Sequence, residues 1–267
     1  MKRTFSLWIL AFSITAASAV YQRMTGPTYP VSETLTLNGK VVTLKFERSH
    51  GGETDFRMQY DTHDPSLQGF VEWKRHKTND PWTRVPLTNT DGRLTADLPH
   101  QPPAGKLDYR VTILDGPAMI SLPTAGPVVV RFKGDVPTAV LLIHVLVMFG
   151  AMLFSTRTGL EVFAKEPKFQ WLAWWTVALL FAGGMVLGPV VQKYAFDAYW
   201  TGWPFGNDLT DNKTAAALLS WIAAAWALKR AKNPKRWVVA AALITLAVFL
   251  IPHSVLGSEL DYSKAGH

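Results

Sequence analysis

The chain carries two kinds of hydrophobic pattern. Residues 21–136 contain short segments in which apolar and polar residues alternate, whereas later apolar residues gather in four long runs. These runs cover residues 137–154, 169–191, 214–228 and 237–251. Because a bilayer core needs about 20 helical residues, the second run crosses it comfortably, and the last two need interfacial residues at their ends. The pattern predicts a four-span transmembrane helical bundle over residues 137–267.

A further apolar segment lies near the N-terminus. Lys2 and Arg3 precede a run from Phe5 to Ala19, which ends in the small-residue pattern Ala17-Ser18-Ala19. A segment of this kind is either a cleaved signal peptide or a retained signal anchor, and the sequence leaves both open for residues 1–20. Either one exports the domain that follows.

Residues 21–136 have the pattern of β structure. Eight alternating or β-branched runs are separated by turn signals such as Asn38-Gly39 and Asp91-Gly92. The runs are Thr34–Leu37, Val41–Phe46, Phe56–Tyr60, Gly69–Trp73, Thr83–Leu87, Arg93–Leu98, Leu107–Leu114 and Val128–Phe132. Short strands at this spacing are typical of a β-sandwich. The fold class we expect is therefore mixed: an N-terminal anchor or signal, an all-β sandwich, and then an α-helical transmembrane bundle.

Part of this β domain resembles a known kind of module. The segments concerned are Phe70–Trp73, Trp82–Leu87, Gly92–Pro99 and Leu107–Gly116. They resemble the immunoglobulin-like or fibronectin-III-like modules that are common outside bacterial cells. The resemblance implies a fold and no function. It offers Tyr109 as a tyrosine-corner residue, although the position suits a core aromatic equally well.

The charges give the membrane segments an orientation. The net charge is +7 and the sequence pI is about 9.6. Basic residues concentrate in loops 155–168 and 229–236, and the second loop alone holds Lys229, Arg230, Lys232, Lys235 and Arg236. The positive-inside rule places both loops in the cytoplasm and the β domain and C-terminus in the periplasm. Because the cations lie beside apolar runs, we exclude nucleic-acid binding and expect membrane lipid as a partner. The absence of cysteine excludes disulfides and thiolate metal sites.

The whole chain also resembles an uncharacterised family of bacterial inner-membrane proteins. The segments that carry this resemblance are Tyr21–Pro30, Trp200–Lys213 and Ile251–Tyr262. It implies an external β domain followed by a four-helix membrane bundle, at the inner (cytoplasmic) membrane. It carries no activity that could be transferred.

The first long run contains a candidate ligand set. His144 lies within it, and Met148 and Met152 follow at spacings of four residues, which places all three on one helical face. An ionisable residue inside a span often marks function, and imidazole with thioethers suits Cu(I). The alternative is that the methionines fill packing gaps and that His144 forms a hydrogen bond within the bundle.

Four more candidates lie at the periplasmic face that the topology predicts. Asp208, Asp211, His253 and Glu259 could contribute to a metal site there. Each has an alternative role: Asp211 as the cap of the third helix, Asp208 in a turn, His253 as a helix end and Glu259 as a solvated charge. The cofactor stays unknown. A metal ion is one candidate, and haem is disfavoured because His144 is expected to lie about 10 Å deeper than His253.

No catalytic motif is recognisable, so the sequence favours a protein that is not an enzyme. The function we expect is an accessory or assembly role, in which the external β domain binds a protein partner of the cell envelope. The alternative is a membrane metal-binding protein, with redox or transport activity, whose site lies on the external face of the bundle.

Overall fold

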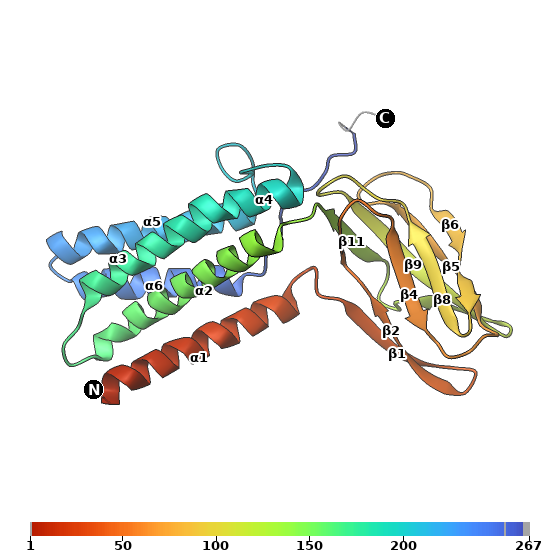
Figure 1. Cartoon of the computed structure of the whole chain (residues 1–267), viewed down its shortest axis with the longest axis horizontal. Coiled ribbons are helices and arrows are strands. Elements are labelled where there is room, and N and C mark those ends of the chain that lie inside the picture. Colours follow the sequence, from red (N-terminus) through yellow and green to blue (C-terminus); the bar gives the residue numbers. More distant parts are fainter. Residues whose placement is uncertain (1, 254, 264–267) are drawn as a thin grey trace. The chain divides into compact units, whose positions relative to one another are not determined.

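The computed structural model describes residues 2–253 and 255–263. Its backbone divides into two compact units, shown in Figure 1. The helical unit comprises the chain up to Pro27 together with Val136–Ser258, and the β unit comprises Thr28–Asp135 together with the tail that begins at Glu259. The hydrophobic pattern assigns this tail to the helices, whereas its contacts group it with the β unit.

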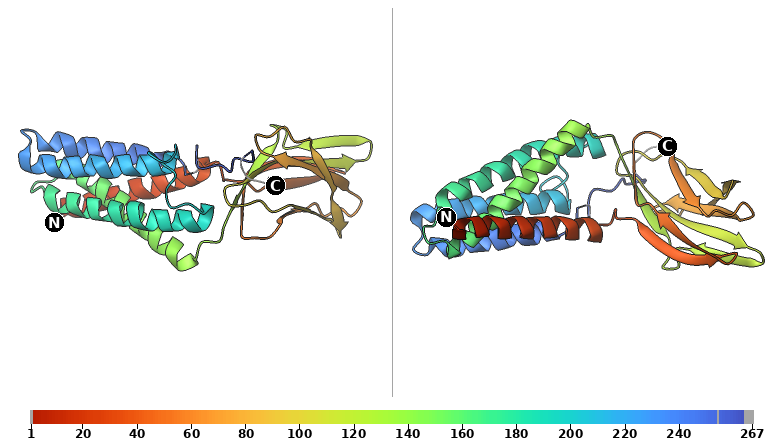
Figure 2. Two further views of the ribbon diagram at one scale, coloured as in Figure 1. Left: turned by 90° about the horizontal axis from the view of Figure 1, so that it is seen from above. Right: turned by 60° about the horizontal axis from the view of Figure 1, so that its bottom comes forward.

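The helical unit is built from helical segments that pack side by side (Figure 1). They are α1 (Lys2–Thr25), α2 (Thr138–Leu160), η1 (Glu161–Phe163), α3 (Phe169–Leu180), η2 (Phe181–Leu187), α4 (Gly188–Phe196), α5 (Leu209–Arg230) and α6 (Pro234–Leu250). The N-terminal helix α1 packs against α2 and α6, as the two views in Figure 2 also show.

Among the described residues, three helical stretches are long and apolar enough to cross a membrane. They are Thr4–Thr25, Thr138–Phe163 and Phe169–Phe196. Two of the four predicted spans therefore lie in such stretches, and the N-terminal segment forms the third. The remaining runs form α5 and α6, which pack in the same bundle. The helix α6 has only 17 residues, and the first turns of α5 carry charged side chains.

The second span contains a π-helical stretch, η2, for which the sequence gives a cause. Pro189 has no N–H, so the α-helical bond to the carbonyl of Met185 cannot form. Next to it, the Gly188 N–H bonds to Gly183 O, five residues back. Gly183 and its neighbour Gly184 also let other helices approach closely: a Cβ at Gly184 would lie 2.4 Å from Thr214 Cγ2 of α5.

Trp221 of α5 is fully buried at the centre of the bundle. Its indole N–H donates to Thr245 Oγ1 of α6 at 2.9 Å and lies 3.2 Å from Ser155 Oγ of α2. A buried polar atom without a partner is costly in an apolar bundle. The Trp221 hydrogen bonds therefore fix the relative positions of three helices.

The described residues of the β unit form eleven strands. They are β1 (Val31–Leu37), β2 (Lys40–Phe46), β3 (Ser49–Gly51), β4 (Phe56–Asp61), β5 (Gln68–Arg75), β6 (Thr83–Pro86), β7 (Thr88–Thr90), β8 (Arg93–Leu98), β9 (Lys106–Asp115), β10 (Ala118–Leu122) and β11 (Val128–Lys133). All eight predicted strands are confirmed, with small shifts at their ends. The sequence analysis missed β3, β7 and β10.

The strands form three sheets around one hydrophobic core. The largest has the order β3-β11-β9-β5-β6 with β10 also paired to β9, and the others are β4-β8-β7 and the hairpin β1-β2. Neighbours are antiparallel except β3 and β11. Inward-facing residues of all three sheets, such as Leu44, Leu94 and Val111, share the core. This places the polar side chains of β5, β6 and β9 on the outer face of the largest sheet.

Tyr109 is a core aromatic and not a tyrosine-corner residue. Its ring is fully buried, and its hydroxyl donates to Glu47 O at 2.8 Å. Glu47 lies 62 residues earlier in the chain, whereas a tyrosine corner bonds to backbone only a few residues upstream. The bond therefore joins β9 to the end of β2.

Candidate functional sites

The helical unit contains a cavity of about 210 Å³ between α1, α2 and the end of α6. His144, Met148 and Met152 of α2 line it, as does His253, which follows α6. The structure thus brings together the two histidines and the methionine face that the sequence singled out. The cavity wall is otherwise mainly apolar, with Val145 and Phe149 beside these side chains.

His144 is oriented by a backbone bond. Its Nδ1 lies 3.1 Å from Gly183 O, and because a carbonyl only accepts, Nδ1 carries the proton. The neutral ring therefore keeps Nε2 as an unprotonated lone-pair donor. The acceptor belongs to the π-helical stretch, so the irregularity that Pro189 imposes also positions this histidine.

The chain just before His253 is held by side chains of two other helices. The Gln22 amide of α1 donates to Phe249 O at 2.7 Å, and Lys213 Nζ of α5 donates to Ile251 O at 2.6 Å. The last carbonyls of a helix have no partner within it, so these bonds act as a cap. They fix where α6 ends and therefore where His253 lies.

Thr15 of α1 also lines the cavity, and sequence analysis missed it. Its side chain is 5% exposed, and within the described part of the chain its Oγ1 has no hydrogen-bond partner. A buried hydroxyl in a helix ordinarily bonds to a carbonyl one turn earlier. Nothing in an apolar N-terminal segment distinguishes such a threonine from one that is satisfied.

Asp208 caps α5. Its Oδ1 accepts the Thr210 N–H at 2.7 Å, and its Oδ2 accepts the N–H of Ser258 at 2.8 Å. The prediction that Asp211 is the cap was wrong, because α5 begins three residues earlier than the position we assigned to it. Asp208 thus joins the start of α5 to the segment of the helical unit that follows α6.

Asp211 organises the loop between α4 and α5. One of its oxygens, Oδ2, accepts the backbone N–H groups of Thr201 at 2.7 Å and Gly202 at 2.9 Å, and the Gln192 amide at 3.2 Å. These donors stabilise the negative charge of the Asp211 carboxylate without a cation. The structure therefore places Asp208 and Asp211 in a hydrogen-bonded loop, and neither is among the residues that line the cavity.

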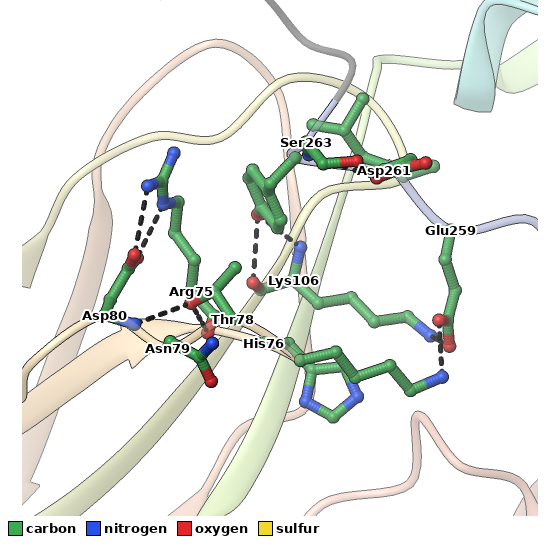
Figure 3. A pocket seen from close by; sticks show the side chains of 13 residues that line it. Arg75, His76, Thr78, Asn79, Asp80, Lys106, Glu259, Asp261 and Ser263 are labelled. Carbon is green, nitrogen blue, oxygen red and sulfur yellow. Dashed lines mark hydrogen bonds and ion pairs between the residues drawn. The ribbon is translucent and has the colours of Figure 1, made fainter.

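Glu259 lies in the β unit, where it bonds to two lysines. Its carboxylate accepts from Lys106 Nζ at 2.5 Å and from Lys77 Nζ at 2.6 Å (Figure 3). Partial burial favours the protonated form, but the bonds from Lys106 and Lys77 outweigh it and lower the pKa of Glu259 to about 2. Tyr262 follows on the tail, and its hydroxyl accepts the Lys106 N–H at 2.9 Å. These contacts dock the tail on the β unit.

The described residues contain no group of three or more His, Asp or Glu side chains that could hold a metal ion. The predicted carboxylate ligands therefore do not gather around the histidines. What remains of the candidate set is His144, Met148, Met152 and His253, all of which line the cavity.

A second candidate site lies on the outer face of the largest sheet. Six side chains that contact one another by stacking or by hydrogen bonds form what we call the ladder: Phe70, Glu72, Lys74, Trp82, Arg84 and Arg110. The guanidinium of Arg84 lies 3.9 Å from the centre of the Phe70 ring, and its Nη2 donates to Glu72 Oε1 at 3.1 Å. Arg110 Nε donates to Glu72 Oε2 at 2.9 Å, and its guanidinium lies 4.8 Å from the centre of the Trp82 ring. Lys74 Nζ lies 5.5 Å from the centre of the same ring.

Glu72 is the electrostatic centre of the ladder. Burial raises its pKa, but the hydrogen bonds from Arg84 and Arg110 prevail and hold that pKa below its ordinary value. The carboxylate is therefore ionised at neutral pH and offsets one of the three cations. The ladder remains a cationic surface, and Arg84 is 61% exposed on it.

A scan of protein-family models finds no match to this chain, and a search of curated proteins finds none.

Proposed function

We propose that the chain is an integral protein of a bacterial inner membrane whose β unit is an immunoglobulin-like sandwich in the periplasm. The three long apolar helices support the membrane assignment. At 1.5 Å per residue, α5 and α6 are about 33 Å and 26 Å long, close to the thickness of a bilayer core, which supports them as two further spans. The shared core of the β-sheets supports a sandwich.

Exposed aromatic side chains support the same placement. Trp171 and Trp174 lie at the start of α3, and Tyr194 lies near the end of α4. Tryptophan and tyrosine are enriched at both faces of a membrane, where they contact lipid headgroups. Retention of α1 is part of the proposal, since Gln22 caps α6.

Cysteine labelling tests the orientation, because the natural chain has no cysteine. Asn233 lies in the basic loop, and Phe205 lies in the loop at the other end of the bundle, where it is 82% exposed. A membrane-impermeant maleimide added to intact spheroplasts is expected to label Phe205→Cys and to spare Asn233→Cys until the membrane is opened. The reverse labelling would refute the orientation.

The role we propose is binding of an acidic protein partner of the cell envelope through the ladder. The ladder itself is the observation that carries this proposal. Arginine and tryptophan dominate the energetics of protein interfaces. Side chains that are already stacked and hydrogen-bonded lose little conformational entropy on binding. The excess of cations favours a partner surface of opposite charge.

Site-specific photocrosslinking in cells tests this role. A benzophenone amino acid at Lys74, within the ladder, is compared with one at Gln59, on the outer face of β4. We expect a recurrent heavier species from position 74 and none from position 59. Adding Arg84→Ala should reduce that species about tenfold, as truncation of an interface hot spot costs about 1–2 kcal/mol. Equal crosslinking from both faces would contradict the proposal.

A further inference from the structure

The donor atoms that line the helical cavity form an unusual set. Two imidazoles and two thioethers line it, and no carboxylate is among the described lining residues. Thioethers are soft ligands that favour Cu(I), and imidazole also binds copper. Zinc, in contrast, usually takes three or four nitrogen, oxygen or thiolate ligands, of which this cavity offers two.

We propose that this cavity binds one Cu(I) ion through His144, Met148, Met152 and His253. The His144 bond to Gly183 O is the outer contact that a metal-binding histidine commonly makes, since it fixes the tautomer and leaves Nε2 for the ion. The same bond confirms the expectation that His144 forms a hydrogen bond within the bundle, and it leaves the other ring nitrogen for the cavity.

Thr15 provides a second and independent observation. Its hydroxyl is buried, lacks a partner among the described residues and lies in the cavity wall. A buried hydroxyl left unsatisfied costs free energy, so it is expected to bond to something that the cavity holds. A water molecule held in the cavity beside the four ligands of the ion would satisfy it.

The charge and size of the cavity favour the same ion. All four ligands are neutral, and the nearby ammonium of Lys213 contacts the carbonyl of Pro252, which precedes His253. A single positive charge is less costly than two in such surroundings. The volume of about 210 Å³ is below that of usual cofactor pockets and suits a single ion bound by these side chains.

Metal retention by the purified full-length protein tests the proposal. The protein in detergent is loaded with Cu(I) under ascorbate and challenged with bicinchoninate. We expect about one copper per chain to remain on the wild type. We expect Met148→Leu and His253→Ala each to weaken retention at least tenfold. Met185→Leu is the matched control, because Met185 lies in η2 and outside the cavity lining, and it should behave as wild type.

X-ray absorption at the copper edge supplies a readout that packing alone would not change. The wild type should show sulfur and imidazole scattering, and the sulfur contribution should fall in Met148→Leu and vanish when Met152→Leu is added. Leucine preserves side-chain volume, so these variants are expected to fold. Copper lost to bicinchoninate by the folded wild type, or retained equally by every variant, would overturn the proposal.

Discussion

The docking of the tail on the β unit is expected to weaken at low pH. Glu259 has a pKa of about 2 when it bonds to Lys77 and Lys106, whereas its ordinary value is 4.5. Because the docked value is the lower one, the carboxylate stabilises docking above about pH 4.5. This stabilisation is lost as the pH falls toward 2.

The size of this effect follows from the two pKa values. A difference from 4.5 to about 2 corresponds to at most about 3 kcal/mol. Glu259 is 34% exposed and Lys77 is 66% exposed, so solvent screens the pair. A contribution of about 1–2 kcal/mol is therefore the realistic expectation.

Amide hydrogen exchange measures whether the tail is docked. The Leu260 N–H donates to Ala104 O at 3.1 Å, so its exchange reports local opening of the tail. At pH 7, Glu259→Gln should lower protection of the peptide containing Leu260 by about 5–30-fold. Measuring both proteins at each pH removes the intrinsic pH dependence of exchange, and their ratio should approach one as the pH falls.

The control is Glu33→Gln, which changes a carboxylate that accepts the Thr124 N–H elsewhere in the β unit. Its tail peptide should exchange as in the wild type. Equal protection of wild type and Glu259→Gln at pH 7, or a ratio that does not change with pH, would refute the reasoning.

Two further predictions concern the helical unit, both measured by thermal unfolding in detergent. Trp221→Phe removes the donor to Thr245 and should cost about 1–3 kcal/mol, while Trp226→Phe, on an exposed face of the same helix, should stay within about 0.5 kcal/mol. Gly184→Ala places a Cβ 2.4 Å from Thr214 Cγ2 and should cost about 1–3 kcal/mol through overpacking. Adding Thr214→Ser deletes that methyl group and should recover most of the loss; no recovery would disprove the steric explanation.

The strands could be predicted because alternation and turns are local signals. The eight predicted strands carry inward-facing apolar residues at period two, as β8 and β9 do. The three missed strands are short or exposed: β3 and β7 have three residues each, and β10 has four exposed or half-buried residues out of five. Their strand conformation depends on pairing with a neighbour, which sequence periodicity does not report.

The candidate site was predictable where a helix sets the spacing. His144, Met148 and Met152 share a face because the helix repeats every 3.6 residues. The contacts of Asp208 and Asp211 depend on the path of the loop between α4 and α5 and on the first turn of α5, whose backbone N–H groups they accept. The contacts of Glu259 depend on two lysines far away in sequence. Thr15 Oγ1 has no hydrogen-bond partner among the described residues, and this depends on what surrounds the side chain in space, so no sequence signal exists for it.

The π-helical stretch η2 has a consequence for how this chain tolerates insertions and deletions. Each residue added to or removed from a helix turns everything beyond it by about 100°. The wider turn of a π-helix accommodates one additional residue, so deleting one residue of η2 is expected to restore α-helical pairing there and to keep Gln192 beside Asp211 and the loop that both residues hold. The same deletion in a regular helix such as α5 would turn the residues beyond it away from their neighbours.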